Sequence, residues 1–125
     1  MSLENIQLTI TLSDPQLDDK ERLQEDTQNI LSEIQEFDGV QKADLMPIEK
    51  AEPGSKSIGG FLVGILTAEI NAKNIKALVG YLGNNLYGKT IKIKAEGNGR
   101  KIDFEVRNLE DLKKALAEVD SFLNA

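Results

Sequence analysis

The segment TIKIKAEGNGRKIDFEV at residues 90–106 constrains the fold more than any other part of the chain. Asn98-Gly99 is a favoured pair for a two-residue type I′ turn, and the residues on both sides alternate between apolar and charged. With these two residues as the loop, the facing pairs are Glu96 with Lys101, Lys94 with Asp103, Lys92 with Glu105, Ala95 with Ile102, Ile93 with Phe104 and Ile91 with Val106. Every charged pair has opposite signs. The segment therefore predicts a β-hairpin with one apolar and one charged face.

Two other segments predict strands. IQLTITL at 6–12 alternates between apolar and polar residues, which predicts a strand with one solvent-exposed face. Residues 40–48 read as another strand, and Pro47 favours an edge position or the strand's end.

Helical spacing predicts two helices that flank these strands. The first follows Ser13-Asp14-Pro15 and ends near Gly39, with an inward side of Leu23, Thr27, Ile30, Leu31 and Ile34. The last helix is capped by Asn108, with an inward side of Leu109, Leu112, Leu116, Val119 and Leu123.

Apolar residues recur at helical spacing almost continuously between residues 58 and 85. One uninterrupted helix over this range would be about 42 Å long. A compact domain of this size has a radius of gyration of only about 14 Å, so the helix cannot be straight and continuous. We therefore expect a broken or double helix, with the break at residues 71–74.

The expected element order is β-α-β-α(α)-β-β-α. Three of the four strands have one polar face, so helices can cover only one side of the sheet. The chain of 125 residues is expected to form one domain, 1–125. The predicted fold class is α+β, a two-layer α/β sandwich of ferredoxin-like character, with a four-stranded sheet and helices on one face.

Composition excludes several kinds of chemistry. The chain has no cysteine and no histidine, so disulfides, thiolate metal sites and histidine-based catalytic triads are all excluded. We expect no cofactor and no metal site. The net charge of -6 disfavours nucleic acid and anionic lipid as partners. No classical signal peptide or membrane-spanning stretch is apparent, and we expect a cytoplasmic protein.

The stretch EPGSKSIGGFLVGIL at 52–66 invites comparison with a phosphate-binding loop. Gly60 and Phe61 stand where a P-loop requires lysine and Ser/Thr, so the nucleotide motif fails at its two chemical positions. A helix beginning after the loop would still offer free amides to a small anion. The candidate anion or partner contacts are Gly54, Ser55, Lys56, Ser57 and Gly59. The alternative is a tight corner, in which Ser57 caps the helix and nearby glycines allow close packing.

Three further groups of residues are weaker candidates. Four acidic residues have no EF-hand spacing and are better explained as a solvated cluster: Asp14, Asp18, Asp19 and Asp38. Tyr81 and Tyr87 have the ordinary role of aromatic rings packed on the core. Basic residues on the open sheet face suggest an RNA-binding sheet in outline only, because stacking aromatics are missing: Lys92, Lys94, Lys101 and Arg107.

The whole pattern resembles the effector-associated constant component family (first type) of bacterial conflict systems. The features that carry the resemblance are Pro53-Gly54 with Gly59 before an apolar helical stretch, and Gly99-Arg100 at a hairpin tip. The turn here is longer than in that family, and the first helix lacks the arginine and tryptophan often seen there. The resemblance implies a non-enzymatic adaptor or signal-coupling domain that works beside peptidases, nucleases or nucleotide-driven switch proteins. It implies no catalytic residues.

Three functional hypotheses follow. The first is a non-enzymatic intracellular protein-interaction module that docks an effector or sensor protein through the open sheet face or the edge near Pro47, with a homodimer also possible. The alternative is a small-ligand sensor that holds an anion or phosphometabolite in the Gly54–Gly60 loop. An enzyme built on carboxylates is the third, and it rests only on the abundance of Asp and Glu.

Overall fold

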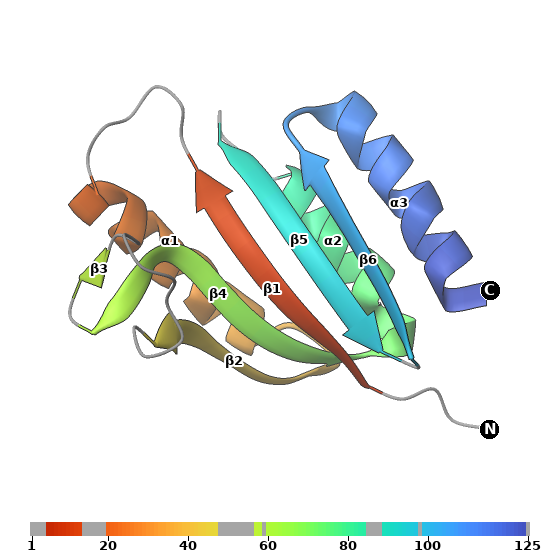
Figure 1. Cartoon of the computed structure of the whole chain (residues 1–125), viewed down its shortest axis with the longest axis horizontal. Helices are drawn as coiled ribbons and strands as arrows, with labels where there is room; N and C mark the ends of the chain where they lie inside the picture. Colours follow the sequence, from red (N-terminus) through yellow and green to blue (C-terminus); the bar gives the residue numbers. More distant parts are fainter. Residues whose placement is uncertain are drawn as a thin grey trace.

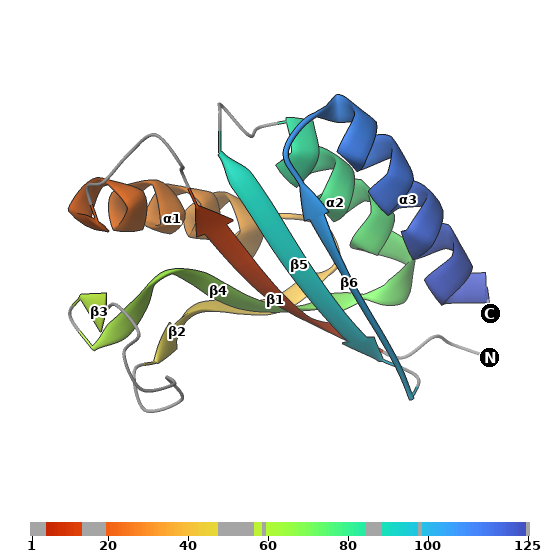
Figure 2. The same ribbon diagram turned by 45° about the horizontal axis from the view of Figure 1, so that its top comes forward.

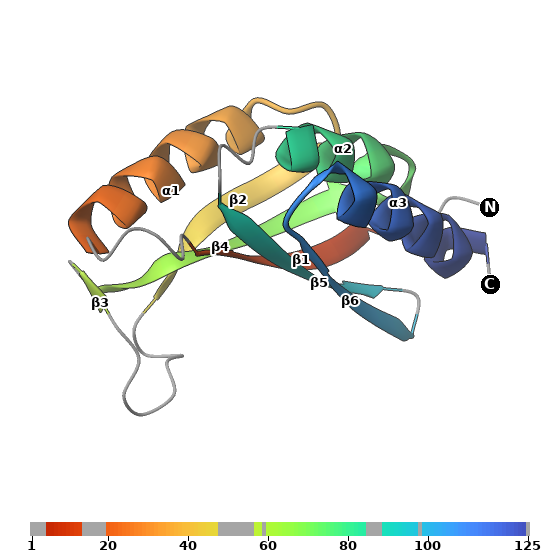
Figure 3. The same cartoon turned by 90° about the horizontal axis from the view of Figure 1, so that it is seen from above.

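The computed structural model describes residues 5–13, 20–47, 57–58, 60–84, 89–97 and 99–124. These residues form an antiparallel sheet with its helices on one face (Figures 1 and 3). The strands are β1 (Asn5–Ser13), β2 (Val40–Pro47), β3 (Ser57–Ile58), β4 (Phe61–Asn71), β5 (Thr90–Gly97) and β6 (Arg100–Val106). The helices are α1 (Lys20–Gln35), the 3₁₀ turn η2 (Ala72–Asn74), α2 (Ile75–Asn84) and α3 (Leu109–Asn124).

The strand order across the sheet is β2-β4-β1-β5-β6, and β3 pairs with the first residues of β4. From β1 to β5 the long elements follow the connectivity β-α-β-β-α-β, with β1 and β4 in the middle, which is the split βαβ arrangement. The hairpin partner β6 and the helix α3 extend this unit at one edge. The prediction of an α+β fold with helices on one face is confirmed. The predicted count of four strands and the order β-α-β-α(α)-β-β-α are wrong.

The error lies in residues 61–71, where a helix was predicted and the strand β4 is found. Leu62, Leu66 and Ile70 are buried toward the helices, while Val63 and Ile65 on the other face are only half-buried. Both neighbours of β4 supply antiparallel backbone partners, β1 on one side and β2 on the other. Helical structure begins only at η2, so the expected break at residues 71–74 marks the boundary between strand and helix.

The predicted hairpin register is confirmed in every pair. Lys92 faces Glu105, Lys94 faces Asp103 and Glu96 faces Lys101 across the β5–β6 ladder. Two of these pairs make ion contacts, at 4.0 Å for Lys92–Glu105 and 3.7 Å for Glu96–Lys101. The turn residue Gly99 has a φ of 75°, a left-handed conformation that glycine adopts without strain.

The core lies between the sheet and the helix layer (Figure 3). Strands β1 and β5 bury their predicted apolar sides, which comprise Ile6, Leu8, Ile10, Leu12, Ile91, Ile93 and Ala95. Helix α1 covers the β2–β4 part of the sheet, while α2 lies beside α3 in the helix layer and α3 also contacts β6. Because β1 and β5 turn polar side chains the other way, the opposite face of the sheet is open to solvent.

Helix α3 begins with the predicted cap, because the side-chain Oδ1 of Asn108 accepts a hydrogen bond of 2.9 Å from the N–H of Asp111. Its predicted inward side is wrong at one position. Leu109 is 61% exposed, while Phe122, which was left out, is 8% exposed. The buried residues of α3 are Leu112, Ala115, Val119 and Phe122, a helical spacing of three and four residues.

Candidate functional site

The candidate anion loop falls mostly outside the described residues, which do not include Gly54, Ser55, Lys56 and Gly59. Ser57 belongs to β3, where it pairs with Leu62, so it is not the cap of a helix. The free amides of a helix N-terminus, on which the anion hypothesis depended, are missing because β4 follows the loop.

The other sequence candidates do not converge. Asp14, Asp18 and Asp19 lie outside the described residues, and the described part of the chain has no group of three acidic residues close enough to hold a metal ion. Tyr87 also lies outside it, while the ring of Tyr81 packs against Phe37 with centroids 5.7 Å apart, which is the expected core role.

Among the described residues, a groove lies between the edge strand β6 and helix α3. It has a volume of about 490 Å³, far more than the space of about 30 Å³ that a single water occupies. Its lining comprises Arg100, Lys101, Ile102, Ala117, Glu118, Ser121 and Phe122. We call this feature the β6–α3 groove. Apolar residues from both elements line it, with charged residues among them, which is the usual character of a binding groove.

The position of α3 creates this groove. In Figures 1 and 2, α3 lies on the side of β6 away from β5, so it projects beyond the last strand of the sheet. It packs on α2 and on β6. At the close approach of α2 and α3, a Cβ added to Gly83 would collide with the side chain of Leu112. The absence of a side chain at residue 83 therefore lets the two helices pack closely.

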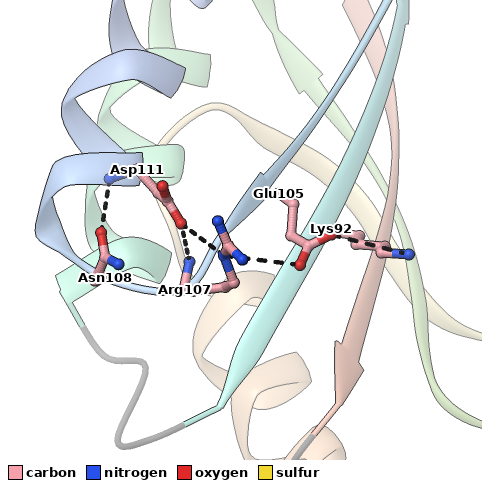
Figure 4. A network of polar contacts seen from close by, with 5 residues as sticks. All are labelled: Lys92, Glu105, Arg107, Asn108 and Asp111. Carbon is pink, nitrogen blue, oxygen red and sulfur yellow. Dashed lines mark hydrogen bonds and ion pairs between the residues drawn. The ribbon is translucent and has the colours of Figure 1, made fainter.

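The junction between β6 and α3 is held by the polar network in Figure 4, whose residues do not line the groove. Arg107 follows β6, and its backbone N–H and its Nε both donate to the carboxylate of Asp111 in the first turn of α3, at 3.1 and 3.0 Å. The Nε of Arg107 also lies 4.0 Å from Glu105, which itself contacts Lys92. This network ties the strand β5, the strand β6 and the start of α3 together.

The same network shifts the pKa values of Asp111 and Arg107. The hydrogen bond from the Arg107 side chain, and then that from its backbone N–H, lowers the pKa of Asp111 below the ordinary value of 3.8. The hydrogen bond to Asp111 raises the pKa of Arg107. Both groups are therefore charged at neutral pH, and the strand-to-helix junction is fixed by a charge-assisted hydrogen bond.

Within the groove, Arg100 reaches from β6 to α3. Its Nη1 donates a hydrogen bond of 2.9 Å to the backbone carbonyl of Phe122 in the last turn of the helix. A cation at this position satisfies a carbonyl that has no partner within the helix and interacts favourably with the helix dipole. The two elements that line the groove are thus tied together at the junction between β6 and α3 and again at Arg100.

Sequence reasoning missed the α3 side of the groove. It placed Lys101 on the open face but assigned no role to Ala117, Ser121 or Phe122. The available signal was the spacing of Leu112, Ala115, Val119 and Phe122, which turns the side of the helix at Ala117 and Ser121 away from the core.

None of the described helices is long and apolar enough to cross a membrane. In comparisons with known proteins, no family model matches this chain, and neither the curated proteins nor the solved structures give a significant match.

Proposed function

We propose that this protein is a non-enzymatic protein-interaction module, an adaptor that binds an effector or sensor protein in the β6–α3 groove. The groove has an edge strand on one side, a helix on the other and apolar residues between them. Such grooves serve as docking sites for segments of other chains. The resemblance described above, to an adaptor family of bacterial conflict systems, supports the same function. The split βαβ arrangement gives the domain its ferredoxin-like character, but the proposal is argued from the groove, because a fold does not by itself specify a function.

The single observation that carries this proposal is the outer edge of β6, which pairs with no strand among the described residues and lies beside α3. The sequence suggested the edge near Pro47 as the docking site. The β2 edge is less suited to it, because its pairing with β4 is irregular at two places and it ends at Pro47. The β5–β6 ladder is regular over its full length.

The small-ligand hypothesis has no comparable support, since the helix N-terminus it required is replaced by β4. It stays a prediction about the Gly54–Gly60 loop. An anionic ligand present at a hundred times its dissociation constant would stabilise the fold by about 2.7 kcal/mol, so a thermal-shift panel of nucleotides and phosphates tests it directly.

The adaptor function is tested by site-specific photo-crosslinking in a native lysate of the producing organism. A photoreactive amino acid replaces Ser121 in the groove or, as a control, Gln28 on the exposed side of α1. We expect a specific protein adduct from position 121 and none from position 28. Recovery of the same proteins from both positions, or of none from position 121 with the folded variant, contradicts the proposal.

A matched pair of substitutions then tests the groove against the captured partner. Ala117→Trp places a large ring in the groove, whereas Ala77→Trp makes the same change at an exposed position of α2 outside it. We expect Ala117→Trp to weaken binding by about tenfold or more, and Ala77→Trp to leave it unchanged. Equal affinities for the two variants, measured by calorimetry, would place the partner elsewhere.

A further inference from the structure

Among the described residues no strand pairs with the outer edge of β6, which presents its peptide groups in a regular row. In a hairpin with a two-residue loop the residues that flank the loop exchange hydrogen bonds, and the pairs alternate from there. Arg100, Ile102 and Phe104 therefore direct their peptide groups at β5, and Lys101, Asp103 and Glu105 direct theirs away from it. Since β6 is the last strand of the sheet, these outward groups are available to another strand.

On the helix side of the sheet, α3 covers the place where such a strand would lie. It projects beyond β6 on the helix side of the sheet (Figures 1 and 2) and leaves the β6–α3 groove beneath it. Alternate side chains of an added strand point to opposite faces of the sheet. Half of them would enter the groove beside Ile102 and Ala117, and the other half would lie beside Lys101, Asp103 and Glu105 on the open face.

The position of α3 also excludes a second copy of this chain as the occupant. A two-fold pairing of β6 with β6 of another copy would bring a second α3 into the same layer. Neighbouring strands lie about 4.8 Å apart, whereas packed helices need about 8–10 Å between their axes, so the two helices would collide. A single extended segment without a helix of its own fits beside β6 and beneath α3.

The charges on β6 specify which extended segment fits. On the open face the strand presents Lys101, Asp103 and Glu105 in that order. Lys101 and Glu105 already have ion contacts, but Asp103, which lies opposite Lys94, has no ion pair within 4.0 Å among the described residues. A basic side chain on the outer side of Asp103 would therefore give this carboxylate a close ion partner, which the described residues do not provide.

We infer that the partner binds by β-strand addition: an extended segment pairs antiparallel with the outer edge of β6, placing a basic residue opposite Asp103 and an apolar residue in the β6–α3 groove. This inference rests on the proposed function and deepens it. The chain itself contains a sequence with the required charges, because in β5 Lys92, Lys94 and Glu96 face Glu105, Asp103 and Lys101.

A synthetic peptide with the β5 sequence TIKIKAEG serves as the probe, and TIEIEAKG, with each charge reversed, is its control. Titration of the folded ¹⁵N-labelled protein with each peptide is followed by amide chemical shifts. We expect TIKIKAEG to shift the amides of Lys101, Asp103 and Glu105, and to bind about tenfold more tightly than TIEIEAKG. Asp103→Lys removes this preference, while Asp44→Lys, on the opposite edge strand β2, keeps it.

The outcomes separate this inference from the proposed function. Equal binding of the two peptides, shifts confined to other parts of the sheet, or no shift at millimolar peptide overturns strand addition at β6. A partner crosslinked at position 121 would then still support the adaptor function, with a different binding mode. Failure of that crosslinking together with specific binding of TIKIKAEG would instead leave strand addition standing and remove the proposed lysate partner.

Discussion

The backbone N–H of Gly64 donates a buried hydrogen bond of 2.9 Å to the side-chain Oε1 of Gln24. The two residues are forty positions apart, one in α1 and the other in β4. Gly64 has a φ of 80°, and the pairing of β2 with β4 becomes irregular beyond Leu45 and Leu66. Gln24 thus binds a peptide N–H where the regular ladder is interrupted, and anchors the helix to the sheet.

Gly64→Ala is expected to destabilise the fold by about 2–4 kcal/mol, because the left-handed backbone disfavours alanine and the added Cβ crowds its neighbour. That Cβ would lie 2.7 Å from the carbonyl oxygen of Leu12. The matched control is Gly80→Ala in α2, where a Cβ meets nothing within 4 Å and helix propensity gains about 0.5–1 kcal/mol. Urea unfolding measures both. A Gly64→Ala protein as stable as the wild type would contradict the assigned backbone conformation.

Gln24→Met is expected to cost about 1–2 kcal/mol in unfolding free energy, because the N–H of Gly64 loses its acceptor. Removal of the Gln24 Nε2, a buried atom without a hydrogen-bond partner among the described residues, offsets part of that cost. The control Gln28→Met changes an exposed residue one turn further along α1 and should stay within about 0.5 kcal/mol of wild type. Similar losses for both variants would show that the hydrogen bond to Gly64 contributes nothing.

Lys101→Glu is expected to reduce stability by up to about 1 kcal/mol, since it places two carboxylates opposite each other in the β5–β6 ladder. Glu96→Lys should have a similar effect, and the double variant should recover most of the loss. Thermal unfolding of the four proteins gives the coupling energy of this pair. Additive losses would mean that the cross-strand pair contributes no coupling.

Acid should weaken the junction between β6 and α3 through Asp111. Its pKa is lowered below 3.8 in the folded state by the hydrogen bond from Arg107, so its stabilising contribution is complete well above pH 3.8 and is lost as pH falls through the folded-state pKa. Asp111→Asn lacks this contribution at every pH. The difference in unfolding free energy between wild type and Asp111→Asn should therefore shrink steadily as pH falls from about 5 toward 2. A difference that stays constant over this range would contradict the lowered pKa.

The sequence determined the elements whose patterns are local and unambiguous. The Asn98-Gly99 turn and the alternating charges of residues 90–106 set the hairpin register, because a shift by one residue would turn apolar side chains to the charged face. The cap at Asn108 likewise depends only on a side chain and the backbone three residues later. The sequence also indicated a sheet covered on one face, through the alternation in β1 and β5.

Only the tertiary structure decided the conformation of residues 61–71 and the existence of the β6–α3 groove. Phe61, Leu62, Ile65, Leu66 and Ile70 fit a helical period, and an apolar run of this kind is also compatible with a central strand. The strand is favoured because β1 and β2 supply backbone partners on both sides, a long-range gain that no local pattern contains. The groove likewise depends on where α3 lies relative to the edge of the sheet, which is fixed by contacts with α2 and with β6.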